Sequence, residues 1–256
     1  MHLYVIGGDI LEGIVNDELQ IYRGKDFFVK DGIIIHQCTL DEICDYGERD
    51  YWSMIYTLTS VGADMKFQLF DLGVDYTQIG DFELFYNLLC RGFINDKTRI
   101  IFGDLDFTKF QMYKKQDESI IMYDAESNIE IDEYTYLLIT DVLRKMHGLK
   151  RNDQLPANEL TKQILIDDAR DEYNVNKNKE YHSQLKNMVS AMINSEGFKY
   201  NHDEVWNMKI NAFIDSVRRI SKIKNADLLL QSGYSGYGIS LKDVSKQQID
   251  WLGELD

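Results

Sequence analysis

The sequence is poor in proline and cysteine. Pro156 is the single proline in 256 residues, and such scarcity suits long helices, because proline interrupts a helix interior. The three cysteines, Cys38, Cys44 and Cys90, are odd in number, and no two of them have CxxC spacing. The sequence therefore argues against a disulfide framework and indicates a reducing compartment.

Long apolar runs and basic residues are also scarce. No run approaches the roughly 18 residues of a membrane span, and the first residues, MHLYVIGGDILEG, lack the basic segment and apolar core of a secretion signal. Lysine and arginine number 28 against 43 aspartate and glutamate residues, which gives a formal net charge of −15. Binding to nucleic acid requires basic surface, so we expect neither nucleic acid nor membrane as a partner.

Recognised catalytic motifs are missing as well. The sequence contains no GxxxxGK[ST], GxGxxG, HExxH or GxSxG pattern. Asp104 and Asp106 form a DxD pair, which can present two carboxylates to a divalent cation. With 43 acidic residues in the chain, however, such a pair also arises by chance. We therefore assign no catalytic residue, no metal ligand and no cofactor, and we expect the protein not to be an enzyme.

What the chain does contain is a series of local structure signals. Asp31-Gly32 between the apolar segments Phe27–Val29 and Ile33–Ile35 predicts an N-terminal β-hairpin, because Asp-Gly favours a tight turn. Thr39 and Glu42 have the spacing of a capping box, which predicts the start of a helix. Residues 50–91 then predict further helices between glycine turns. Met1–Gly8 indicates either a short strand or an arm.

The middle of the chain alternates in the manner of strands. Four segments predict a small antiparallel sheet, namely Thr98–Phe102, Phe107–Tyr113, Ser119–Tyr123 and Asn128–Ile131. Asp132 is placed to cap a following helix, which Gly148 ends. The predicted fold class is thus α+β and predominantly α-helical, with this sheet in the middle of the chain.

A change of composition suggests how the chain divides. Residues 149–157 are mostly polar and include the single proline, so we predict a linker there. The linker separates an N-terminal α+β region, residues 1–148, from a helical C-terminal region, residues 158–256. Asn158 is placed to cap a long helix that breaks near residues 174–178. Asn201 is predicted to cap an amphipathic helix, and Asn225 a second short helix, Ala226–Gln231.

Aromatic residues supply the candidate binding surface. Tyrosine is frequent, with 16 residues, and tyrosine and tryptophan favour interfaces because each combines a large apolar area with one polar atom. The alternative interpretation of any one of them is ordinary core packing. The residues that we predict to contact a partner are Trp52, Tyr56, Trp206, Phe213, Tyr234, Tyr237 and Trp251.

Two stretches resemble a family of proteins from tailed bacteriophages of Gram-positive hosts. Residues 33–89 contain IIIHQCTLDEICDYGERDYWSMIYTL, FDLGVDY and DFELFYNLL, and residues 206–251 contain WNMKINAFIDSVRRISKI, GYSG and IDW. Similar phage proteins have proline where this chain has Cys38. The resemblance implies a tail-module protein, either a tail assembly chaperone or a virion structural component. Its implied partners are other phage tail proteins, self-association into a homo-oligomer is allowed, and its implied location is the host cytoplasm during assembly or the virion tail.

Two other hypotheses remain open at this point. One is a metal-dependent enzyme that uses Asp104, Asp106 and a distant histidine. The other is an acidic host-takeover protein that inhibits a host enzyme by imitating the charge of nucleic acid, which predicts carboxylates concentrated on one face.

Overall fold

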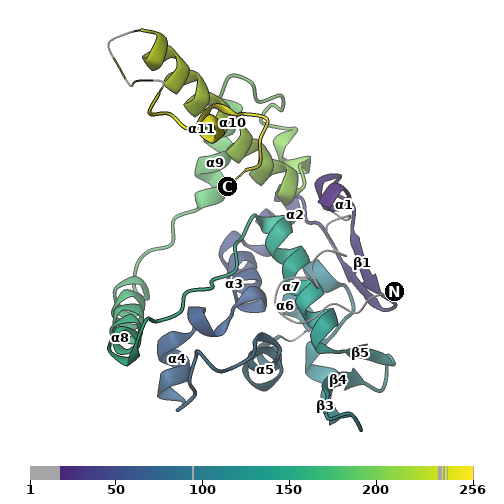
Figure 1. The fold of residues 1–256 in the computed structure, drawn as a ribbon. Helices are drawn as coiled ribbons and strands as arrows, with labels where there is room; N and C mark the ends of the chain where they lie inside the picture. Colours follow the sequence, from purple (N-terminus) through teal and green to yellow (C-terminus); the bar gives the residue numbers. More distant parts are fainter. Residues whose placement is uncertain (1–17, 94, 236–237, 239, 241, 256) are drawn as a thin grey trace, which may run out of the picture.

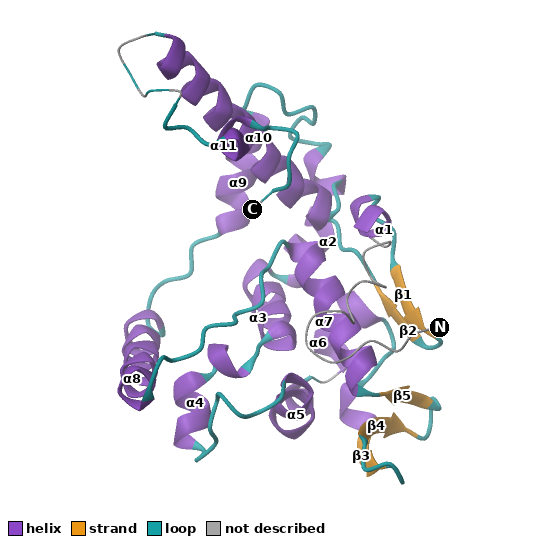
Figure 2. Cartoon of the chain, in the orientation of Figure 1, coloured by secondary structure: helices purple, strands orange, loops and turns teal. Residues whose placement is uncertain are grey.

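The computed structural model describes residues 18–93, 95–235, 238, 240 and 242–255. Helices make up 56% of the structure, and they accompany two small antiparallel sheets of two and three strands (Figure 2). The predicted α+β class with a predominance of helix is therefore confirmed. The predicted strand or arm Met1–Gly8 lies outside the described residues.

The predicted N-terminal hairpin forms. After the short helix α1 (Glu18–Tyr22), strand β1 (Phe27–Lys30) pairs antiparallel with β2 (Ile33–Ile35). Gly32 occupies the turn with a φ of +81°, a conformation that suits glycine. A Cβ atom at this position would lie 2.6 Å from Ile129 Cδ1 of the second sheet. The turn therefore depends on glycine for two reasons, its backbone conformation and the space around it.

The middle sheet is smaller than predicted. Its three strands pair in the order β3 (Gln111–Lys114), β4 (Ile120–Asp124) and β5 (Ile129–Ile131). The predicted strand Thr98–Phe102 is wrong, because these residues belong to helix α6 (Asn95–Phe102). Thr98, Ile101 and Phe102 are buried at the i, i+3, i+4 spacing of a helix face. The first residues of the predicted strand Phe107–Tyr113 form a 3₁₀ turn, Phe107–Lys109.

Helices form most of the remaining structure. Thr39 and Glu42 form the predicted capping box at the start of α2. The α-helices of the first region are α2 (Leu40–Tyr46), α3 (Glu48–Thr59), α4 (Lys66–Asp71), α5 (Asp81–Leu84), α6 and α7 (Glu133–His147), and 3₁₀ or π turns occupy Gly62–Asp64, Phe85–Leu89 and Cys90–Gly92. The later ones are α8 (Glu159–Asn176), α9 (Gln184–Ile193), α10 (Ile210–Tyr234) and α11 (Lys246–Ile249), with a 3₁₀ turn at Val205–Asn207.

Helix α7 lies at the centre of the core. As predicted, Asp132 caps its first turn and Gly148 ends it in a left-handed conformation. Val142, Leu143 and Met146 on this helix have no exposed surface. The helix packs against α1, α3, α5, α10, β1 and β5 (Figure 1). Elements from both ends of the chain thus share one hydrophobic core.

The C-terminal helix begins later and runs longer than predicted. Asn201 caps only a turn, in which its side chain accepts hydrogen bonds from the Asp203 and Glu204 amides. Helix α10 starts at Ile210 because the preceding residues pair with the chain near Thr39: the Leu40 amide donates to the Met208 carbonyl. The short separate helix predicted at Ala226–Gln231 is wrong, since α10 continues through it to Tyr234.

Candidate functional site

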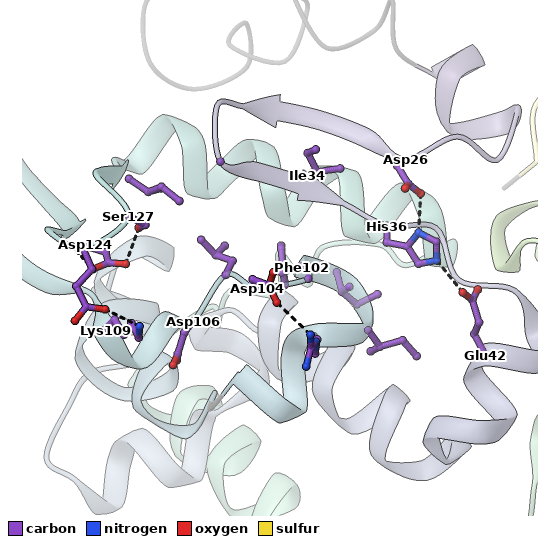
Figure 3. A pocket seen from close by; sticks show the side chains of 18 residues that line it. Asp26, Ile34, His36, Glu42, Phe102, Asp104, Asp106, Lys109, Asp124 and Ser127 are labelled. Carbon is purple, nitrogen blue, oxygen red and sulfur yellow. Dashed lines mark hydrogen bonds and ion pairs between the residues drawn. The ribbon is translucent and has the colours of Figure 1, made fainter.

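A groove of about 840 Å³ lies between the β1–β2 hairpin, α6 and the three-stranded sheet (Figure 3). Strand β2 contributes Ile34, which is 51% exposed, and α6 contributes Phe102. The groove follows from the local folding described above. Gly32 in the hairpin turn lies against Ile129 of β5, and the His36 amide donates to the Ile101 carbonyl at 2.8 Å, which ties the hairpin to α6.

A histidine between two carboxylates forms one end of the groove. His36 Nδ1 lies 2.8 Å from Asp26 Oδ1, and His36 Nε2 lies 3.1 Å from Glu42 Oε1 (Figure 3). Burial raises the pKa of Glu42, but hydrogen bonds from the Thr39 amide and hydroxyl and from His36 outweigh burial and leave this pKa below its usual value. The capping box of α2 thus also fixes a charged group of the groove.

Ion pairs line the rest of the groove. Lys109 Nζ lies 2.7 Å from Glu126 Oε2, and this hydrogen bond raises the pKa of Lys109. The Asp124 carboxylate accepts from the Ser127 hydroxyl at 2.6 Å, and this bond is the main cause of the lowered pKa of Asp124. Asp124 is therefore held in its charged state at neutral pH.

The groove as a whole is acidic. Six carboxylates face two cations, Arg99 and Lys109, which gives a formal charge of −4 when His36 is neutral; the carboxylates are Asp26, Glu42, Asp104, Asp106, Asp124 and Glu126. Together with the exposed Ile34, this lining is complementary to a basic segment that carries an apolar side chain. The chemistry that the arrangement supports is recognition of a positively charged partner.

The DxD pair lies in this groove. Arg99 pairs with the Asp104 carboxylate at 3.3 Å, and Asp106 accepts from the Thr108 amide and hydroxyl at 3.0 and 2.6 Å. His36 lies at the other end of the same groove (Figure 3). Within the described part of the chain, no three His, Cys, Asp or Glu side chains come together as a metal site.

Two of the predicted partner-contacting residues form an aromatic pair on α3. The rings of Trp52 and Tyr56 lie 5.8 Å apart, and Trp52 also contacts Tyr51 and the buried His147. Tyr56 is 55% exposed, so this pair presents an aromatic surface. The Tyr51 hydroxyl lies 2.6 Å from His147 Nε2. Burial raises the pKa of Tyr51 well above its usual value.

The other predicted residues lie on separate elements. Trp206 is half-buried in a 3₁₀ turn beside His202, and Tyr234 is 80% exposed at the end of α10. Trp251 is half-exposed, and its carbonyl accepts from Arg219 of α10 at 2.6 Å. Phe213 has no exposed surface, so a partner of the folded chain cannot reach it. Tyr237 lies outside the described residues.

The groove residues other than Asp104 and Asp106 were not predicted from sequence. His36, Asp26 and Glu42 are within 17 positions of one another, but only the hairpin and the helix that follows bring their side chains together. The one local signal was the capping box, which places the Glu42 carboxylate beside Thr39. Lys109 and Glu126 meet through pairing of β3 with β4.

The comparisons with known proteins concern the C-terminal third of the chain. A family model described as the YomV second domain matches residues 176–256. YomV is a Bacillus phage-region protein, so the C-terminal part of this chain is similar to a phage-associated domain. No curated protein and no solved structure gives a significant match.

The matched segment contains residues 206–251, one of the two stretches that resemble phage proteins in sequence. For this stretch the phage association is therefore confirmed, whereas the resemblance of residues 33–89 and the tail-specific role remain predictions. The segment covers α9, α10 and α11 and starts at the last residue of α8. Among the described residues, no helix is long and apolar enough to cross a membrane.

Proposed function

We propose that this protein is a non-enzymatic bacteriophage tail morphogenesis protein that acts by binding other proteins. It serves either as a tail assembly chaperone or as a tail structural component. The observation that carries the proposal is the similarity of residues 176–256 to a phage-associated domain. The tail-specific part rests on the sequence resemblance of residues 33–89 and 206–251.

The acidic groove is the binding site that we propose for a basic segment of a tail protein. Its β2 and α2 walls belong to residues 33–89, the first resembling stretch. Each exposed ion pair with such a segment contributes about 0–1 kcal/mol, so affinity requires several pairs together with apolar contact at Ile34. Salt at 1 M shortens the Debye length to about 3 Å, so binding should weaken as salt rises.

The aromatic pair Trp52 and Tyr56 and the exposed Tyr234 and Trp251 are additional contact points in this proposal. Aromatic side chains that remain partly exposed on a folded acidic protein are a usual means of protein recognition. The proposed partners are other tail proteins, with a second copy of the chain as a further one. Binding takes place in the host cytoplasm during assembly, and a structural component stays in the tail.

The experiment is affinity purification of the tagged chain from phage-producing cells, combined with mass spectrometry of finished particles. Tail proteins in the purified fraction and absence of the chain from particles support a chaperone. Many copies in particles support a structural component. Association with no virion protein would refute both versions. Tight binding of Mn²⁺ that is lost in an Asp104→Asn, Asp106→Asn variant would instead favour the metal-dependent enzyme.

A further inference from the structure

Helix α8 is set apart from the rest of the fold. It lies beside α4, at a distance from the other helices of the C-terminal region (Figure 1). The segments on either side of it, residues 149–158 and 177–183, contain neither helix nor strand. Arg151 and Asn152 of the first connection donate to Asp81 and Asp64. The remaining residues 153–158, and residues 177–183, can each span about 20–25 Å when extended, which leaves α8 room to move as a unit.

A narrow set of contacts holds α8 against α4. Arg170 donates to both carboxylate oxygens of Asp71, at 2.7 and 3.1 Å, and Lys162 Nζ lies 2.7 Å from Asp75 Oδ2. Ile166, between these two cations, is the only residue of α8 that is buried. Lys162, Ile166 and Arg170 have i, i+4, i+8 spacing, which places them on one face of the helix.

Aromatic rings of the α4 region complete this contact. The guanidinium of Arg170 lies 5.6 Å from the ring centre of Phe67, and the ammonium of Lys162 lies 5.9 Å from that of Tyr76. The hydrogen bond from Lys162 is the main reason that the pKa of Asp75 falls to about 2. The α4 region thus presents two carboxylates and two aromatic rings. They are complementary to a helix that carries a cation, an apolar residue and a second cation on one face.

The contact is weak compared with the stability of a whole domain. Exposed ion pairs stabilise little because solvent screens them, and only one side chain of α8, that of Ile166, is buried in the contact. The stability of a folded domain instead comes from burial of many apolar side chains, as in the core around α7. Release of α8 from α4 should therefore cost less than unfolding of the core around α7.

We infer that α8 is a displaceable latch over a docking face formed by Phe67, Asp71, Asp75 and Tyr76. A helix of a partner protein binds this face in place of α8. That helix carries a basic residue, an apolar residue and an arginine at positions i, i+4 and i+8, as α8 does. The inference rests on the proposed protein-binding function for the origin of the partner helix. The latch itself is a property of this chain that can be measured without any phage protein.

The test uses a fluorescent peptide with the sequence of residues 157–178 and four full-length chains. Three of these are the wild type, the latch-weakened Ile166→Asp and the Ile166→Asp, Asp71→Lys double variant. The fourth is the control Ile166→Asp, Glu196→Lys, which reverses an exposed carboxylate outside the face. Fluorescence anisotropy should give roughly ten-fold tighter binding to Ile166→Asp than to the wild type, whose own latch competes. Asp71→Lys should abolish binding, whereas Glu196→Lys should retain it. A peptide with Arg170→Asp should regain binding to the Asp71→Lys double variant.

The inference would be overturned if the peptide bound the wild type and Ile166→Asp with equal affinity. It would also be overturned if the Asp71→Lys substitution left peptide binding unchanged. Hydrogen exchange on the wild type tests the same point without any substitution. Amides of residues 166–176 should exchange at least about 100-fold faster than those of residues 139–147, and equal rates would contradict the latch. If the latch is confirmed but no tail protein is captured from cells, only the proposed function fails.

Discussion

Burial of His147 makes a sharp prediction about stability and pH. His147 is buried beneath the aromatic pair of α3, where its Nδ1–H donates to the Leu143 carbonyl at 2.7 Å and its Nε2 accepts from the Tyr51 hydroxyl. Both ring nitrogens are therefore satisfied in the neutral state, whereas protonation of Nε2 would place a positive charge in a buried site. Desolvation lowers the pKa of His147 from 6.5 to about 4.

The sign and size of the effect follow from linkage. The unfolded chain binds a proton at His147 below pH of about 6.5, whereas the folded chain does so only below about 4. Between these values the unfolded state binds more protons, so stability falls as the pH falls. The loss from this one group is about 2 kcal/mol at pH 5 and about 3 kcal/mol below pH 4.

The assay is urea unfolding at pH 8 and pH 5. The wild type is compared with His147→Gln, so that the contributions of other titrating groups to the pH dependence of stability cancel. The wild type should lose about 2 kcal/mol more than His147→Gln on going from pH 8 to pH 5. His202→Gln is the matched control, because the His202 side chain is 70% exposed, and it should behave as the wild type does. The same pH dependence in the wild type and in His147→Gln would refute the assignment of a buried neutral histidine.

Two further predictions concern the elements that build the groove. Gly32→Ala should lower the free energy of unfolding by about 1–3 kcal/mol, measured by urea titration, because φ is +81° and the new Cβ would meet Ile129; an unchanged midpoint would contradict this packing. Thr39→Ala removes the side-chain half of the α2 capping box and should cost about 1 kcal/mol. Ser190→Ala, at an exposed position inside α9, is its control, and equal losses in the two variants would argue against a specific cap.

Local signals predicted much of the fold. The Asp31-Gly32 turn, the Thr39 capping box and the Asp132 and Gly148 ends of α7 each depend on residues a few positions apart, so the sequence contains their whole cause. The same holds for Asn158, whose side chain accepts from the Thr161 amide at the start of α8. The break after Asn176 was also predicted correctly.

The errors came from contacts between distant residues. Thr98–Phe102 is a short apolar run, and periodicity does not separate a strand from a helix at that length; packing of Ile101 and Phe102 into the core decides for α6. The start of α10 is fixed by pairing of Met208 and Ile210 with residues 38–40, which lie about 170 positions earlier in the chain. No local pattern near Asn201 contains that information.

The candidate groove was beyond sequence reasoning for the same reason. Its charged groups come from the hairpin, α2, α6 and the three-stranded sheet, and each of these elements was recognisable alone only in part. Aromatic composition could not separate Tyr56, which is 55% exposed, from Phe213, which is fully buried. Exposure depends on the complete tertiary structure and not on residue type.

We propose that the chain works by binding a tail protein through its acidic groove. The most direct measurement is quantitative capture of tail proteins by the wild type and by Asp104→Lys, Glu126→Lys, which cancels the groove charge of −4 at two exposed positions. We predict roughly ten-fold less capture by this variant, while Glu196→Lys, Asp243→Lys, at exposed sites outside the groove, captures as the wild type does. Equal capture by the groove and control variants, or no tail protein with the wild type, would contradict the claim.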